Sequence, residues 1–232
     1  MLLKTLREEV LEANLELVRR GLVLYTFGNV SGIDRSENLV AIKPSGVPYE
    51  ELTPAHIVVS DLEGNIVDGN LRPSSDLPTH LALYKRFSNV GGVAHTHSEF
   101  ATAWAQAEKP IPCFGTTHAD YFHGPVPVTE RLSSSEIAGN YELETGDAIC
   151  RTFARLDPDT LPAVLVAGHA PFCWGKSAHD AAHVAVILEY VARMAHHTLT
   201  INADSQPLAR ELHDKHFLRK HGRNATYGQV KS

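Results

Sequence analysis

The feature that most limits the possible folds of this chain is a mixture of two hydrophobic periods. Leu3, Leu6, Val10 and Leu17 belong to an apolar series with steps of three and four, which predicts an amphipathic helix ended by Gly21. Short β-rich runs bounded by turn residues follow, and helical patterns alternate with them further along the chain. We find no repeat and no long linker in the 232 residues. The sequence therefore predicts one α/β domain over residues 1–232.

The expected elements can be assigned to residue ranges from their patterns. We expect strands at 22–27, 39–44, 56–61, 91–97, 161–168 and 171–175. We expect the later helices at about 74–87, 98–107, 177–195 and 207–221. Ser177 and Asp180 form a capping-box-like start for the longest of these helices.

Composition and charge exclude several classes of function. The formal net charge is −6, and no basic patch with interleaved aromatic residues is present, so we expect no nucleic-acid partner. No apolar run is long enough to span a membrane, so we expect no membrane partner. Cys113, Cys150 and Cys173 are scattered and odd in number, which favours reduced thiols in a cytoplasmic protein.

Histidines supply the first chemical constellation. His95 and His97 lie two residues apart in a strand pattern, so their side chains leave the same face, about 7 Å apart along the backbone. That spacing suits two ligands of one zinc ion, with His169 and Asp76 as plausible further ligands. Taken alone, such a pair is more often merely polar and surface-facing, and the sequence alone does not place His169 beside it.

Three small polar turns form the second constellation. They are Gly28-Asn29, Lys43-Pro44-Ser45-Gly46 and Ser74-Ser75. Glycine lets backbone amides approach an anion, serine donates a hydroxyl, and a helix N-terminus exposes unpaired N–H groups. These turns are candidates for phosphate binding, although each taken alone is more often an ordinary turn or helix cap.

Two further segments carry acid and base groups. Asp120 lies in a histidine-rich loop between Gly115 and Gly124, where an aspartate can also be a simple turn residue. His216 lies on a basic final helix, and Tyr227 lies in the tail beyond it. Because tails usually fray, an aromatic residue there suggests docking against another surface.

In their order, these segments resemble the class II aldolase family, which includes the adducin-like domains, and most closely its sugar-phosphate epimerases. The stretches that carry the resemblance are GNVSGID, IKPSGV, PSSDLPTH, GGVAHTHS, GTTHADYFHG, ETGDAI, VLVAGHAPFCWG and KHFLRKHGRNATYGQ. They span nearly the whole chain. The resemblance implies a single-domain class II aldolase-like fold, with a central, largely antiparallel sheet flanked by helices.

The resemblance also implies roles for individual residues. Zinc, one Zn²⁺ per subunit, would be held by Asp76, His95, His97 and His169. The phosphate pocket would comprise Asn29, Lys43, Ser45, Gly46, Ser74 and Ser75. Asp120 would be one acid/base residue. Tyr227 would be the other, supplied by a neighbouring subunit, with His216 nearby as a substrate-binding residue. The protein would be a cyclic homotetramer whose tail, about residues 222–232, docks on the neighbour.

The implied reaction converts L-ribulose 5-phosphate to D-xylulose 5-phosphate. C4 has no acidic hydrogen, so inversion requires cleavage and re-formation of the C3–C4 bond, with zinc as Lewis acid and two acid/base groups on opposite faces. The alternatives are an L-fuculose-1-phosphate-type aldolase, in which glutamate replaces Asp76, and a non-catalytic adducin-like binding domain. The sequence leaves open whether arabinose, ascorbate or related sugar breakdown supplies the substrate.

Overall fold

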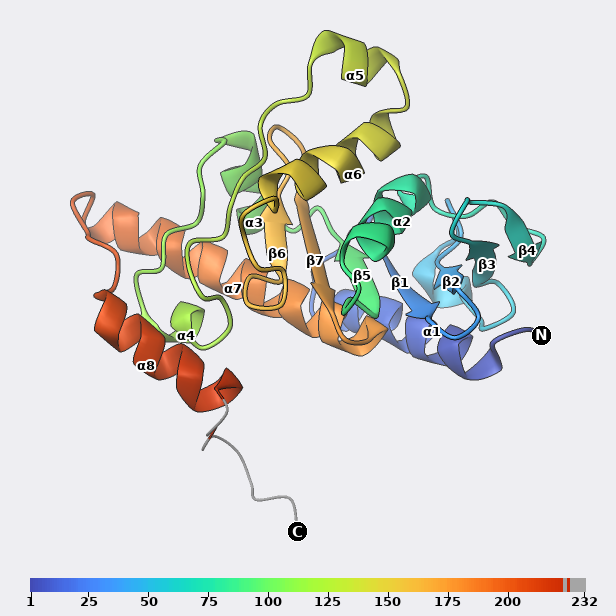
Figure 1. Cartoon of the computed structure of the whole chain (residues 1–232), viewed down its shortest axis with the longest axis horizontal. Coiled ribbons are helices and arrows are strands. Elements are labelled where there is room, and N and C mark those ends of the chain that lie inside the picture. The colour runs from blue at the N-terminus through green and yellow to red at the C-terminus, as the bar shows by residue number, and fades with distance from the viewer. Residues whose placement is uncertain (223–224, 226–232) are drawn as a thin grey trace.

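The fold is built around a seven-stranded antiparallel sheet, with strand order β4-β3-β2-β1-β5-β7-β6 (Figure 1). The computed structural model describes residues 1–222 and 225. The strands are β1 (Asn29–Asp34), β2 (Leu39–Ile42), β3 (Val58–Asp61), β4 (Ile66–Asp68), β5 (Gly92–His95), β6 (Ala163–Leu165) and β7 (Pro171–Gly175). This sheet confirms the predicted single-domain α/β fold.

Helices lie on both faces of the sheet. They are α1 (Lys4–Arg19), α2 (Leu77–Arg86), α3 (Glu99–Gln106), α4 (Thr116–Ala119), α5 (Ser134–Ala138), α6 (Tyr141–Thr152), α7 (Ala178–Ile201) and α8 (Arg210–His221), with a 3₁₀ turn, η1, at Tyr49–Glu51. Successive residues of β1 show the division of the two faces. Gly32 lies close to Leu6 and Val10 of α1, whereas the Ser31 hydroxyl bonds His80 and Tyr84 of α2.

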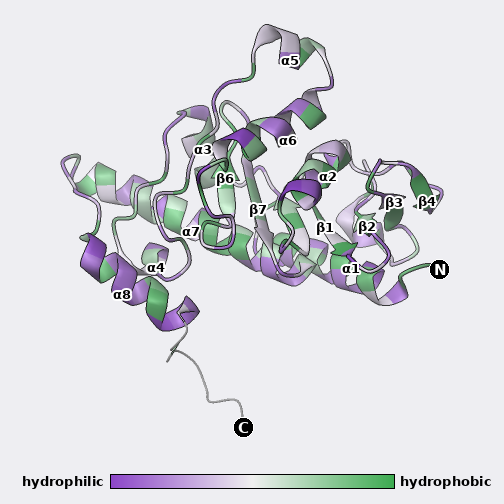
Figure 2. Cartoon of the chain, in the orientation of Figure 1, coloured by the Kyte–Doolittle hydropathy of each residue, from purple (hydrophilic) through white to green (hydrophobic). Residues whose placement is uncertain are grey.

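The core lies between the sheet and these helices. Figure 2 shows apolar residues along the strands and on one side of α1 and α7, while α8 is mostly hydrophilic. Val10 and Leu17 of α1 and Leu188 of α7 are completely buried, as expected for apolar stripes that face a sheet. The α1 and α7 helices therefore cover one face of the sheet, and α6 packs over α2 on the other.

Several of the expected helix boundaries hold, but α7 continues to Ile201, six residues beyond its predicted end at 195. Gly21, just after α1, has a left-handed backbone (φ 68°), as predicted for a residue that ends a helix. The Ser177 hydroxyl accepts a hydrogen bond from the Asp180 amide at 3.1 Å, which confirms the predicted start of α7. The final helix begins at Arg210, three residues later than Pro207, the predicted start.

The predicted strand at 22–27 is wrong. This segment is a loop in which Leu24, Tyr25 and Phe27 are 70%, 88% and 55% exposed. Both edges of β1 are already paired, by β2 and by β5, so the sheet offers this segment no neighbouring edge. Local β propensity was therefore overridden by the pairing of the strands.

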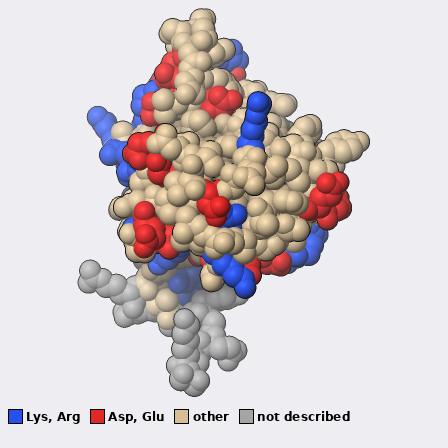
Figure 3. All heavy atoms as spheres, turned by 90° about the vertical axis from the view of Figure 1, so that its right-hand side faces the viewer, with Lys and Arg blue, Asp and Glu red and all other residues tan. Residues whose placement is uncertain are grey.

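Charged side chains of both signs lie on the described surface. On the face shown in Figure 3, basic and acidic side chains are interspersed. Within the described part of the chain, no helix is long and apolar enough to cross a membrane. The three cysteines are free thiols, two of them buried.

Candidate metal centre and phosphate pocket

Three histidines converge where β5 ends and β7 begins. His95 is the last residue of β5, His97 lies just beyond that strand, and His169 lies in the loop between β6 and β7. The Nε2 atom of His95 is 3.2 Å from that of His97 and 3.3 Å from that of His169. Since β5 ends at His95, the predicted strand was too long, but both imidazoles do lie on the same side.

The chemistry of these imidazoles suits a divalent metal ion. Burial, reinforced by His95 and His97, lowers the pKa of His169 to about 4, and burial also lowers the pKa of His97. Both rings are therefore neutral at pH 7, which is the form that binds metal. The Nδ1 atom of His95 lies 2.9 Å from the Pro171 carbonyl, so its Nδ1–H can donate there and leave Nε2 free.

Asp76 lies beside this cluster, at the start of α2. Its Oδ2 accepts a 2.6 Å hydrogen bond from Asn29 Nδ2, and Asn29 is aligned with His95 across β1 and β5. Burial opposes ionisation of Asp76, but the nearby His95 and His80 hold the pKa of this carboxyl below its usual range. Among the described residues, the close group of possible ligands comprises the three histidines, so the role of Asp76 as fourth ligand stays a prediction.

The three predicted phosphate turns lie together. The Ser74 amide donates to the Lys43 carbonyl and the Ser45 amide donates to the Arg72 carbonyl, both at 2.9 Å. Asn29 Nδ2 lies 3.0 Å from the Ser74 hydroxyl, which connects the first turn to the other two. Ser45, Gly46 and Ser75 are exposed at the same place. The side-chain oxygen of Asn29 is buried without a hydrogen-bond partner among the described residues.

Lys43 provides an uncompensated positive charge in this pocket. It is 1% exposed, and its ammonium contacts the carbonyls of Thr26 and Pro44, at 3.5 and 3.3 Å, and the ring of Tyr49. No carboxylate in the described part of the chain pairs with it. Burial lowers its pKa to about 8, so it remains mostly protonated at pH 7. A buried cation without a counter-ion favours binding of an anion.

Asp120 and His216 contact each other at a different place. Asp120 follows α4, and its carboxylate accepts from His216 Nδ1 at 3.0 Å and from Arg219 at 3.1 Å, with the Lys220 ammonium at 3.5 Å. Burial opposes ionisation, but the hydrogen bonds from Arg219 and His216 and the charge of Lys220 hold the pKa of Asp120 below its usual range. All these partners belong to α8, and Figure 1 shows α4 and α8 together at one end of the molecule, apart from α2 and β5.

The predicted site residues and those that the structure describes differ at the C-terminal tail and at two contacts between elements. Tyr227 and its predicted docking on a neighbour lie outside the described residues. Sequence reasoning missed Tyr141, whose hydroxyl oxygen is 3.3 Å from His169 Nδ1. It also missed the contacts that Arg219 and Lys220 make with the Asp120 carboxylate. The stretches ETGDAI and KHFLRKHG flagged both neighbourhoods, but spacing did not reveal these contacts.

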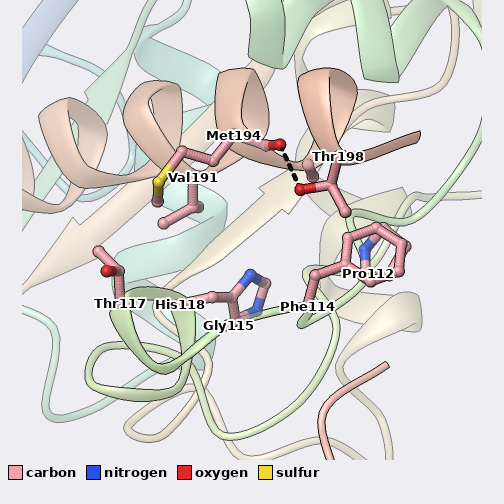
Figure 4. A pocket seen from close by; sticks show the side chains of 9 residues that line it. Pro112, Phe114, Gly115, Thr117, His118, Val191, Met194 and Thr198 are labelled. Atoms are coloured by element: carbon pink, nitrogen blue, oxygen red, sulfur yellow. Dashed lines mark hydrogen bonds between the residues drawn. The ribbon is translucent and has the colours of Figure 1, made fainter. Parts of the chain in front are cut away.

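A separate cavity of about 160 Å³ lies between the α4 loop and the second half of α7 (Figure 4). Phe114, Val191 and Met194 make most of its wall apolar, and the Thr198 hydroxyl donates to the Met194 carbonyl. His118 also lines it, but no predicted site residue does. It is therefore distinct from the histidine cluster and the phosphate turns.

Comparisons with known proteins show the family of this chain. The family model described as Class II Aldolase and Adducin N-terminal domain matches residues 8–196. The chain belongs to this family. It is 53% identical over 227 residues to the L-ribulose-5-phosphate 4-epimerase UlaF of Salmonella paratyphi A, covering 98% of this chain and 100% of the relative. The same identity and coverage are found with UlaF of Salmonella typhi.

Solved structures of the family share the fold. An L-fuculose 1-phosphate aldolase superposes with a TM-score of 0.78 at 25% identity, covering 91% of this chain and 94% of that chain. YgbL of Klebsiella pneumoniae, described as a putative aldolase/epimerase/decarboxylase, gives a TM-score of 0.73 at 27% identity, covering 91% and 97%. The predicted class II aldolase fold is therefore confirmed.

Proposed function

We propose that this protein is an L-ribulose-5-phosphate 4-epimerase, which converts L-ribulose 5-phosphate to D-xylulose 5-phosphate. The observation that carries this proposal is 53% identity, over essentially the full length of both chains, to epimerases of that name. The convergent Nε2 atoms of His95, His97 and His169 beside a cationic pocket agree with it. An ordinary binding module would have no need for this combination of groups.

The residues present fit a zinc ion. His95, His97 and His169 would hold Zn²⁺, one per subunit, with Asp76 as an oxygen ligand from the start of α2. Neutral imidazoles and a carboxylate form a donor set that zinc commonly takes. The ion would act as a Lewis acid, which stabilises negative charge that develops on substrate oxygens.

The surrounding residues would bind and orient the substrate. Lys43 would neutralise part of the phosphate charge, and Ser45, Gly46, Ser74 and Ser75 would donate hydrogen bonds to its oxygens. The side-chain amide of Asn29 lies between these turns and Asp76, so it would hold the substrate at the junction of the two regions. A phosphate held there would retain the aldehyde fragment while its carbonyl face turns.

Proton transfer would come from Asp120 and Tyr227, with His216 positioning the carboxylate. Because its cationic partners keep Asp120 ionised, it suits the role of base. Asp120 contacts α8, and no contact joins it to His95, His97 or His169 within the described residues, so we propose that it serves the metal centre of a neighbouring subunit. A homotetramer with active sites between subunits, whose tail carries Tyr227 to the neighbour, follows from this proposal. We also place the enzyme in the cytoplasm, in keeping with its free cysteines.

The proposal is tested by following the product. Purified protein should convert L-ribulose 5-phosphate to D-xylulose 5-phosphate, detected by coupling the product to transketolase. The same preparation should cleave L-fuculose 1-phosphate at least a hundredfold more slowly. The reverse ratio would assign the chain to the aldolases, and the absence of both activities in zinc-loaded protein would favour an adducin-like binding domain.

A further inference from the structure

Tyr141 is a polar group beside the histidine cluster for which the proposed reaction has no role. Its hydroxyl oxygen lies 3.3 Å from His169 Nδ1, and the two rings meet edge to face with centroids 6.1 Å apart. It is the first residue of α6, a helix remote in sequence from every predicted metal ligand except His169. The contact therefore connects the metal centre to a second layer of the fold.

The start of α6 is held firmly in place. The Thr145 hydroxyl donates to the Tyr141 carbonyl, and the Asn140 side chain caps the Leu143 amide. The Thr79 hydroxyl on α2 donates to the carbonyl of the next residue, Glu142. These contacts fix the backbone from which the phenol extends, so the phenol is a positioned group.

Close packing of α6 against α2 adds to this rigidity. A Cβ atom at Gly146 would lie 2.6 Å from the Ala82 side chain and 3.2 Å from the Thr79 backbone. Only glycine allows the two helices to approach so closely. Because Asp76 immediately precedes α2, the same packing holds Tyr141 close to the predicted oxygen ligand.

The contact determines which nitrogen of His169 is available. The Nε2 atoms of His169 and His95 are 3.3 Å apart, so Nε2 is the atom that faces the proposed metal. When Nε2 binds a cation, Nδ1 must carry the proton and needs an acceptor. The Pro171 carbonyl is that acceptor for His95, and the only side-chain oxygen in the described residues that contacts His169 Nδ1 is the Tyr141 phenol.

We propose that Tyr141 is a positioning residue of the metal centre: its hydroxyl oxygen accepts the Nδ1–H of His169 and fixes that ring with Nε2 toward His95 and His97. This inference rests on the proposed zinc site and extends it to a residue outside the ligand set. Partners of this kind typically change metal affinity 10- to 100-fold when removed. The effect therefore belongs to metal binding, and it does not require Tyr141 to touch the substrate.

The test compares zinc affinity in wild-type protein, Tyr141→Phe and Tyr84→Phe. Tyr84 is a matched control, since its buried hydroxyl bonds Ser31 in the core and contacts none of the three histidines. Zinc dissociation constants come from competition with a chromophoric chelator, and cobalt(II) absorption spectra report the ligand geometry. We expect roughly 10-fold or greater loss of affinity and an altered cobalt spectrum for Tyr141→Phe, whereas Tyr84→Phe lowers the melting temperature with affinity unchanged.

The outcomes separate this inference from the proposed function. If wild-type protein binds no zinc, the metal proposal itself fails. If wild-type protein binds zinc and Tyr141→Phe matches it in affinity and spectrum, the positioning role is overturned and the metal site stands. Should Tyr141→Phe fold poorly, Tyr141→Gln, which keeps a polar acceptor, must bind zinc more tightly than Tyr141→Leu. Equal affinity of these two would also overturn the inference.

Discussion

At the scale of single residues, burial sets the chemistry of the site. The imidazole of His169 is partly buried and neutral, so it suits a cation. The buried ammonium of Lys43 has no counter-ion among the described residues, so it suits an anion. Charges without partners reduce the stability of a folded protein and are therefore good markers of ligand sites. The histidine pair, Lys43 and the serine turns could be recognised from residue type and spacing.

Lys43→Met should raise stability and weaken substrate binding. Because burial lowers the pKa of Lys43 to about 8, the folded state disfavours the charged form, and stability should rise with pH between about 8 and the unfolded value near 10.5. Removing the charge at pH 7 should add about 1–3 kcal/mol, or several degrees in melting temperature. KM for the sugar phosphate should rise at least tenfold.

Calorimetry and steady-state kinetics check both effects, with the exposed Lys176→Met as control. A lower melting temperature together with an unchanged KM would mean that Lys43 is a structural cation and that the phosphate pocket has been misassigned.

Ser75→Ala should act mainly on binding. The Ser75 hydroxyl is exposed beside Ser74, and no hydrogen bond within the described residues occupies it. An interaction with phosphate is similar in the ground and transition states, so its loss raises KM more than it lowers kcat. Kinetics of Ser75→Ala beside the exposed Ser88→Ala test this, and a pure kcat defect would argue against the assignment.

At the scale of elements, the site depends on where strands and helices end. The sequence allowed prediction of β5, of α2 and of the left-handed residue after α1, because periodicity and turn chemistry are local properties. The loop at 22–27 could not be predicted, since the pairing of both β1 edges is a long-range property. Tyr141 contacts a residue 28 positions away, and Asp120 contacts residues at least 96 positions away. No local pattern encodes these contacts.

Gly28→Ala should disturb the metal centre through the backbone. Gly28 has φ 75°, and a Cβ atom there would lie 2.9 Å from the His95 carbonyl oxygen. A left-handed non-glycine residue costs about 1–3 kcal/mol, and the clash would also displace His95. Gly21→Ala is a matched control, because it has φ 68° with no atom within 4 Å. Gly28→Ala should lose both stability and zinc affinity, whereas Gly21→Ala should lose stability alone. Equal zinc affinity in the two variants would show that the backbone at Gly28 does not position His95.

At the scale of the whole molecule, the two groups that we propose to form one active site lie apart within a single chain. The histidine cluster lies at the ends of β5 and β7, whereas Asp120 is held by α8 at another end of the fold. The exposed loop with Leu24, Tyr25 and Phe27 lies beside the cluster, with the Phe27 ring 6.1 Å from that of His97. Both observations agree with a neighbouring subunit that completes the site.

Mixed oligomers test this arrangement. Asp120→Asn and His97→Asn should each be nearly inactive, because one lacks the proposed base and the other a metal ligand. Refolded together, they should form some sites with intact histidines from one chain and Asp120 from the other, and activity should return. The pair His97→Asn and His169→Asn should not recover, since both lesions affect the same cluster. Mixed tetramers confirmed by native mass spectrometry without recovered activity would rule out a shared site.

The most direct test of the central claim is a zinc titration of metal-free protein, with conversion of L-ribulose 5-phosphate to D-xylulose 5-phosphate measured at each step. We expect activity to be absent without metal and to rise linearly until about one zinc ion per chain is bound, because the proposed site holds one ion. His97→Asn should remain inactive over the same range. Full epimerase activity in metal-free wild-type protein would contradict the account.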